Sequence, residues 1–309
     1  MATAVDYDRA MRVGLAAFSV VALTCAPALA DPAIAFDAAA KRLFPGGAPA
    51  SCTDTACLID ARYAKDAKAS ALARALYDAT GDLAGVGPDE TMDGGYRGKI
   101  HIVPELPIRG YRQHLAWVSS AMAKIDQFFT QQFPDKPPAY RWRALELGFV
   151  RSVGKHTPSA YAGSWTIVYN VEGSLLTSED GVRETLFHEL FHLNDEDHGD
   201  WSHHTLAKDY EAILDRCGKH PTMKCLAPYA PNVTVVRGGT YYAFQQDNGD
   251  SVHEYAAELA VRYFDEQSEM RRRGKLAKPA FKCGPAENAR AWHALVDEFF
   301  AGQDLVPSC

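Results

Sequence analysis

Two histidines four residues apart, with a glutamate directly after the first, are the residues that most clearly indicate chemistry in this chain. His188, Glu189 and His192 form the pattern H-E-x-x-H within a run whose apolar residues recur at helical spacing. On a helix such histidines lie about 40° apart around the axis and about 6 Å apart along it, so both imidazoles can reach one metal ion. The pattern predicts one Zn2+ ion per chain, with Glu189 placed to take a proton from a zinc-activated water.

A third zinc ligand is needed, because catalytic zinc has three protein ligands and one open position. His198 is one candidate: it lies ten residues after His188, the metzincin spacing, although Asp195 replaces the glycine of that pattern. Glu254 is the other candidate. It lies one helical turn before Glu258, so one carboxylate can bind metal while the other hydrogen-bonds a ligand histidine. We take Glu254 as the predicted ligand and His198 as the alternative.

The same segment resembles a known family, the gluzincin metallopeptidases, and within them the catalytic domain of anthrax-lethal-factor-like proteases. In that family an H-E-x-x-H helix is followed by a tyrosine-bearing loop and a helix with an E-x-x-A-E type motif. Here Thr240-Tyr241-Tyr242-Ala243 precedes Glu254-Tyr255-Ala256-Ala257-Glu258. The interval between tyrosine and glutamate is longer than in the family, so the choice between Tyr242 and Tyr241 stays open.

The resemblance extends from about Trp165 to Phe264 and implies a zincin-like domain with a small mixed sheet, an H-E-x-x-H helix and a later glutamate-bearing helix. It also implies the role of each residue. The implied zinc ligands are His188, His192 and Glu254, the general base is Glu189, the oxyanion donor is Tyr242, and the carboxylate supporting a ligand histidine is Glu258.

These residues predict a secreted zinc metallopeptidase, a hydrolase that acts on protein or peptide substrates. The segment Ser164–Asn170, just before the metal-binding helix, is predicted to be the edge strand that holds an extended peptide by backbone pairing. One alternative is a metzincin-type peptidase that uses His198. The other is a non-catalytic secreted zinc-binding or interaction protein on a zincin fold.

The first 30 residues have the features of a secretory signal peptide. An apolar run over residues 13–26 is too short to cross a bilayer, and Ala28-Leu29-Ala30 predicts cleavage before Asp31. No other window approaches the ~20 apolar residues of a membrane-spanning helix. We therefore predict a secreted or periplasmic protein with no membrane association after removal of the signal.

The cysteine count agrees with export from the cytoplasm. Of the seven cysteines, Cys25 lies in the predicted signal peptide, which leaves an even number. The others are near neighbours in the sequence, and an oxidising compartment favours disulfides between them. The simplest connectivity is Cys52–Cys57, Cys217–Cys225 and Cys283–Cys309.

Composition and element order complete the prediction. Hydrophobic residues make up 47% of the 309 residues, as in folded soluble proteins, and the net charge of -7 with little basic clustering argues against a nucleic-acid partner. Helical periodicity predicts helices at 34–44, 64–77, 114–133, from 181 onward, 209–217, 251–271 and 286–300. Strand composition occurs at 99–103, 140–150, 164–169 and 233–244, with a loop over 81–98.

This order of elements predicts an α+β fold. We divide the chain into a signal peptide (residues 1–30), a helical N-terminal segment (residues 31–97) and a zincin-like catalytic domain (residues 98–309).

Overall fold

The structure is a computed structural model that describes residues 33–94, 97–236, 239–245 and 251–309. The chain divides into two units, residues 1–30 and Asp31–Cys309, and the described residues all belong to the second. The predicted signal peptide and its cleavage position lie outside the described residues. Within the described ranges, no helix is both long and apolar enough to cross a membrane.

The helices and strands have the following bounds. The α-helices are α1 (Phe36–Leu43), α2 (Thr55–Arg62), α3 (Ala67–Thr80), α4 (Arg112–Gln132), α5 (Glu179–Asp197), α6 (Trp201–Cys217), α7 (Met223–Leu226), α8 (Ser251–Arg273) and α9 (Ala286–Phe299). The strands are β1 (Leu83–Val86), β2 (Glu90–Asp93), β3 (Lys99–Pro104), β4 (Glu146–Ser152), β5 (Ala160–Gly163) and β6 (Thr166–Asn170). Short 3-10 turns are η2 (Arg109–Tyr111), η3 (Tyr242–Phe244) and η4 (Phe281–Cys283).

Strand β4 is the centre of a mixed sheet. It pairs in parallel with β6 on one side. On its other side the first half pairs in parallel with β1 and the last residues pair antiparallel with β3. Strand β2 extends the sheet beyond β3, and β5 forms the opposite edge, antiparallel to β6. This arrangement of helices around a mixed sheet agrees with the predicted α+β class.

The prediction for the edge strand was wrong. The segment Ser164–Asn170 contains β6, which has β4 on one side and β5 on the other, so its backbone groups are already paired within the sheet. The edge is β5, which immediately precedes that segment. A four-residue strand is too short to show a clear alternation of apolar and polar residues, which is why it escaped prediction.

Two other sequence predictions need correction. The expected loop over residues 81–98 contains β1 and β2, because pairing and burial against neighbouring strands outweigh the glycine and aspartate content. Residues 233–244, expected as strand or hairpin, contain an isolated bridge between Val235 and Tyr241 and the turn η3.

Residues 31–97 contribute strands as well as helices. Helices α1, α2 and α3 come first, and β1 and β2 then pair with β4 and β3 of the later segment. The N-terminal segment is thus joined to residues 98–309 through one continuous sheet.

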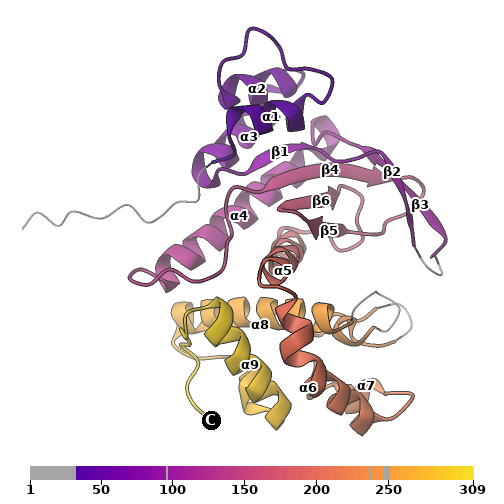
Figure 1. The fold of residues 1–309 in the computed structure, drawn as a ribbon, viewed down its shortest axis with the longest axis vertical. Coiled ribbons are helices and arrows are strands. Elements are labelled where there is room, and N and C mark those ends of the chain that lie inside the picture. The colour runs from indigo at the N-terminus through magenta and orange to yellow at the C-terminus, as the bar shows by residue number, and fades with distance from the viewer. Residues whose placement is uncertain (1–32, 95–96, 237–238, 246–250) are drawn as a thin grey trace, which may run out of the picture. The chain divides into compact units, whose positions relative to one another are not determined.

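The main core lies between one face of the sheet and the helices (Figure 1). On β4 and β6 the side chains of Leu147, Phe149, Ile167 and Tyr169 point into this core. Helix α4, expected over 114–133, buries one apolar face: Leu115, Val118, Met122, Ile125, Phe128 and Phe129. Helix α5 packs against both β5 and α8, and lies between the sheet and α8 (Figure 1). Residues carried by α5 therefore have well-packed surroundings on several sides.

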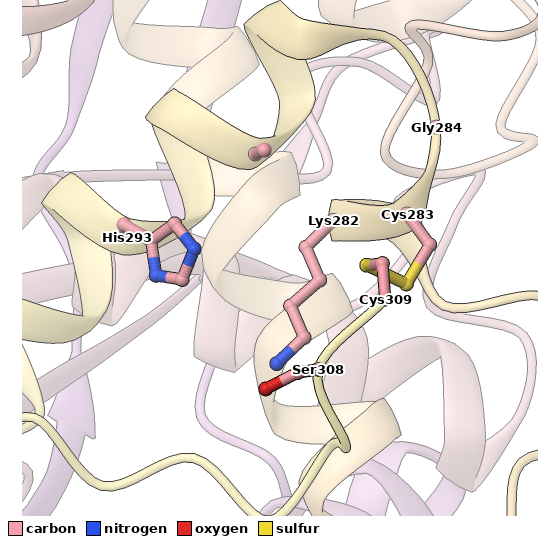
Figure 2. A pocket seen from close by; sticks show the side chains of 7 residues that line it. Lys282, Cys283, Gly284, His293, Ser308 and Cys309 are labelled. Carbon is pink, nitrogen blue, oxygen red and sulfur yellow. A yellow bond between two sulfur atoms is a disulfide. The ribbon is translucent and has the colours of Figure 1, made fainter.

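All three predicted disulfides are formed, between Cys52 and Cys57, Cys217 and Cys225, and Cys283 and Cys309. The last one fastens the C-terminus beside a cavity of about 310 Å³ (Figure 2). Lys282 at this cavity donates hydrogen bonds to Asp304 and to the carbonyl of Val306. Three disulfides and no membrane-spanning helix among the described residues are compatible with an extracellular or periplasmic location.

Asp82, between α3 and β1, is a fully buried carboxyl group. Its Oδ1 accepts a hydrogen bond from the backbone N–H of Leu145, and its Oδ2 lies 2.6 Å from the hydroxyl of Thr80. That hydroxyl also lies 3.0 Å from the carbonyl oxygen of Leu76. Since a hydroxyl has one proton, both contacts are satisfied when protonated Asp82 donates to Thr80 and Thr80 donates to Leu76. Burial raises the pKa of Asp82 to about 7.

This raised pKa predicts a pH-dependent stability. In the unfolded chain the pKa of Asp82 is about 4, so the folded state binds this proton more tightly than the unfolded state does. The contribution of Asp82 to the free energy of unfolding is therefore most favourable below pH 4. The contribution of Asp82 to the free energy of unfolding should fall by about 3 kcal/mol as the pH rises from about 4 to about 7. The substitution Asp82→Asn keeps both hydrogen bonds without a charge. We expect the variant to be more stable than the unsubstituted protein above pH 7, and chemical denaturation across this range measures the effect. An unchanged pH slope in the variant would contradict it.

Candidate metal centre

The histidine pair lies on α5, whose position follows from its own sequence. The side chain of Ser178 caps the helix by accepting a hydrogen bond from the N–H of Gly181. The acidic residues Glu179 and Asp180 in the first turn stabilise the helix, because their negative charges lie near the positive end of the helix dipole. The apolar residues that recur at helical spacing along α5 are buried: Val182, Leu186, Leu190 and Leu193. Packing of these residues fixes the rotation of the helix about its axis, and His188 and His192 lie at its contact with α8.

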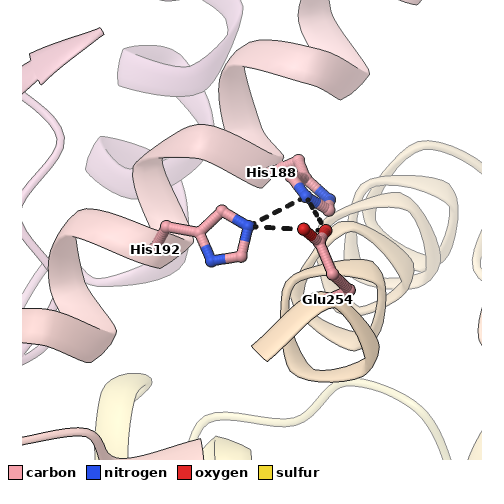
Figure 3. A group of neighbouring side chains, drawn as sticks. All are labelled: His188, His192 and Glu254. Carbon is pink, nitrogen blue, oxygen red and sulfur yellow. Dashed lines mark hydrogen bonds and ion pairs between the residues drawn. The ribbon is translucent and has the colours of Figure 1, made fainter. Parts of the chain in front are cut away.

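Glu254, in the first turn of α8, completes a group of three donors with the histidine pair (Figure 3). The Nε2 atom of His188 lies 2.9 Å from Oε2 of Glu254 and 3.0 Å from Nε2 of His192. The distance from Nε2 of His192 to Oε2 of Glu254 is 3.6 Å. Bonds of about 2.1 Å in a tetrahedral zinc site place ligand atoms about 3.4 Å apart. The residues therefore fit three ligands of one zinc ion, both in spacing and in donor type.

Glu258 lies behind the first histidine, one turn after Glu254 on α8. Its Oε1 atom is 3.2 Å from Nδ1 of His188. A hydrogen bond at Nδ1 leaves the Nε2 lone pair available for a metal ion and fixes the orientation of the ring. The predicted position of Glu258, in support of a ligand histidine, matches this geometry.

The surroundings of the group favour a positive charge. Burial opposes protonation of His188, but hydrogen bonds with Glu254 and Glu258 outweigh burial and raise the pKa of His188 well above its ordinary value. For the carboxyl group of Glu254, burial by itself would raise the pKa. The hydrogen bonds and charges of His188 and His192 outweigh burial and lower the pKa of Glu254. The carboxylate of Glu254 thus lies at the position where a metal cation would bind, while that of Glu258 contacts the far side of the His188 ring.

Glu189, next to the first histidine, is buried, with 7% of its surface exposed. Burial raises its pKa, although the nearby charges of His188 and His192 act in the opposite direction. A carboxylate works best as a general base when its pKa is moved toward the operating pH. The environment of Glu189 is therefore suited to accepting a proton.

Tyr242, in η3, is the tyrosine that reaches the histidines. Its ring lies edge-on to that of His188, with the ring centroids 5.6 Å apart. The backbone N–H of Tyr242 donates to the carbonyl of Thr234, which fixes the turn. Tyr241 instead pairs through its backbone with Val235 and packs at the border of the main core. The structure thus places Tyr242, the tyrosine that the family resemblance implies, next to His188.

His198 is not brought to the histidine pair. Helix α5 continues through Asp195 to Asp197, so the chain does not turn back toward the site as the metzincin spacing would require. Nδ1 of His198 lies 2.6 Å from Oε1 of Glu298, and Nε2 lies 3.0 Å from the carbonyl oxygen of Ala139. Both ring nitrogens therefore face other acceptors, and His198 joins the end of α5 to α9.

A second group of possible metal ligands was not predicted from the sequence. Asp195, Asp200 and His253 place one donor atom each within 4.8 Å of one another. His253 directly precedes Glu254 on α8, whereas Asp195 lies in the last turn of α5 and Asp200 lies before α6. No local motif joins these residues, because their proximity depends on how three helices pack.

Comparison with known proteins adds no further identification. No protein-family model, curated protein or solved structure matches this chain. We therefore infer its function from the residues of the site.

Proposed function

We propose that this protein is a secreted zinc metallopeptidase with a zincin-like fold, in which His188, His192 and Glu254 hold the metal. One observation carries the proposal: three donors from two helices converge at 2.9, 3.0 and 3.6 Å. Glu189 lies next to the first of these donors, as a hydrolytic site of this kind requires.

The residues around the metal have distinct roles in the proposed reaction. Bound zinc would acidify a water molecule and polarise the substrate carbonyl group. Glu189 accepts a proton from the attacking water, whose oxygen forms a bond to the carbonyl carbon. When the peptide C–N bond breaks, Glu189 returns that proton to the leaving amine. The hydroxyl of Tyr242 donates a hydrogen bond to the oxyanion that develops on the carbonyl oxygen.

The edge strand β5 supports a peptide as the substrate. The backbone N–H of Asn170 donates to the carbonyl of Ser159, which makes these two residues a hydrogen-bonded pair of the antiparallel ladder. Alternation along the ladder then turns the N–H and C=O groups of Ala160 and Ala162 away from β6. Strand β5 also packs against α5, the helix that carries the histidines. An extended peptide can therefore pair with β5 next to the proposed zinc.

Proline at position 162 tests this mode of binding. The substitution Ala162→Pro removes the outward N–H without breaking a hydrogen bond to β6, and proline is tolerated on edge strands at such positions. We expect KM for a peptide substrate to rise about fivefold to tenfold, because the variant loses one hydrogen bond, which contributes about 1 kcal/mol to binding. The matched variant Ala162→Val keeps the N–H and should retain most of the substrate affinity. Equal KM values for the two variants would argue against backbone pairing at β5.

Metal content and proteolysis of the purified protein test the proposed function directly. We expect one zinc ion per chain, lost in His192→Ala, together with cleavage of unfolded casein that a chelator abolishes. Zinc binding without turnover on casein or on a peptide library would instead favour the non-catalytic zinc-binding protein. Absence of zinc binding would contradict both functions.

A further inference from the structure

The proposed zinc site needs Glu254 to stay beside histidines that belong to a different helix, 66 residues away from His188 in the sequence. Glu254 lies in the first turn of α8. The ends of helices are where backbone N–H groups lack intrahelical partners and where fraying begins. A contact that fastens this turn to α5 would therefore control the geometry of the metal ligands.

His253, the residue before Glu254, makes such a contact. Its Nε2 atom forms a hydrogen bond with Oδ1 of Asp200, in the link between α5 and α6. The same nitrogen lies 3.8 Å from Oδ2 of Asp195, which is on α5 one turn after His192. The first turn of α8 is thus tied to the end of the helix that carries the histidine pair.

The partners of His253 are themselves held in place. Asp195 is almost completely buried, with 3% of its surface exposed. Its two oxygens accept hydrogen bonds from the backbone N–H and the hydroxyl of Ser202, at 2.7 and 2.5 Å, which fastens the start of α6 to α5. Gly199 and Asp200 both have positive φ angles, 69° and 65°, in the tight reversal between the two helices. His253 therefore binds to a junction that hydrogen bonds between α5 and α6 hold together.

We propose that His253 is a positioning residue: by binding Asp200 and Asp195 it holds Glu254 at metal-binding distance from His188 and His192. This inference rests on the proposed function, because it assigns His253 a role at the proposed zinc site. Outer partners that orient metal ligands commonly change metal affinity 10- to 100-fold when they are removed. The contacts of His253 within the described residues go to Asp200 and Asp195, so its effect would act through the placement of α8.

A second metal ion is the competing explanation for the same cluster. Asp195, Asp200 and His253 have the spacing of a ligand group, and a cation there would take the Nε2 lone pair of His253. The hydrogen bonds that Asp195 accepts from Ser202 give it a structural role at the junction of α5 and α6, which favours the positioning role. The number of zinc ions bound per chain distinguishes the two explanations.

Zinc titration of the whole protein against a competing chelator tests the proposal. We expect His253→Ala to raise the zinc Kd about 10- to 100-fold with the stoichiometry unchanged. At saturating zinc, peptide cleavage should largely return. His253→Gln should recover most of the affinity, because its side-chain amide can donate to Asp200. His101, an exposed histidine on β3 that pairs with Asp89, provides the control. His101→Ala should leave the zinc affinity unchanged.

Several outcomes would overturn the proposal. If the unsubstituted protein binds one zinc and His253→Ala binds it equally well, the positioning role fails while the proposed function stands. A second bound zinc that disappears in His253→Ala would make the residue a ligand instead. Failure of the unsubstituted chain to bind zinc would overturn the proposed function and this inference together. Should His253→Ala not fold, as judged by its melting curve, Asp200→Gly provides the same test, because it removes the acceptor of this hydrogen bond and glycine adopts the positive φ of this position without strain.

Discussion

The substitution Glu189→Gln is expected to abolish peptide hydrolysis while zinc remains bound. Glutamine has nearly the same shape as glutamate, but its amide cannot accept a proton at neutral pH. Loss of a positioned general base typically lowers the rate by about 100- to 10,000-fold. Glu189 is not one of the three converging donors, so the metal content should not change. Cleavage of unfolded casein and the zinc content of the purified variant measure the two quantities independently.

A second glutamate on the same helix provides the control. Glu184 is also on α5, and half of its side chain is exposed. We expect Glu184→Gln to keep both zinc and activity, since this side chain lies outside the group of metal donors. A Glu189→Gln variant that cleaves casein at the rate of the control would exclude Glu189 as the base. Loss of zinc from Glu189→Gln would show that the residue supports the metal site instead.

The substitution Glu254→Gln is expected to have the largest effect on zinc binding. It replaces a charged oxygen ligand by a neutral amide at the point where two histidine nitrogens converge. We expect the zinc Kd to rise more than about 100-fold, beyond the range usual for residues that only orient a ligand. Hydrolysis should fall with the metal content. Competition with a chromophoric chelator measures the affinity, and metal analysis after dialysis measures the stoichiometry.

The alternative ligand from the sequence supplies the comparison for Glu254. His198→Ala removes the contacts with Glu298 and with the carbonyl oxygen of Ala139, so we expect a loss of about 1 kcal/mol of stability. Its zinc affinity should equal that of the unsubstituted protein. The reverse pattern, with zinc lost in His198→Ala and kept in Glu254→Gln, would restore the metzincin-type ligand set.

Long helices with a clear apolar face were the most predictable part of the fold. The expected helix over 251–271 is α8 (Ser251–Arg273), and the expected helix over 286–300 is α9 (Ala286–Phe299). Their periodicity extends over several turns, so it is visible without any neighbour. Strands β1 and β5 have four residues each and became recognisable only through their pairing with β4 and β6. Their stability depends on tertiary contacts rather than on local preference.

The residues of the site likewise fall into those that local sequence predicts and those that depend on tertiary contacts. His188, Glu189 and His192 lie within five consecutive positions of one helix, so helix geometry alone brings the two imidazoles together. The sequence could not decide between Glu254 and His198, because that choice depends on whether the chain turns back after α5 or continues. The contact of Tyr242 with His188 was equally undetermined, since no spacing rule relates a turn to a distant helix.

By itself, the sequence determined the histidine pair with its adjacent glutamate, the near-neighbour disulfides and the α+β class, since each depends on spacing or order along the chain. Only the tertiary structure decided which strand forms the edge, which distant carboxylate meets the histidines, and that His253 joins α8 to the α5–α6 junction. These features depend on how α5, α6 and α8 pack against each other. That packing arises from the burial of many apolar side chains together, and no short segment encodes it.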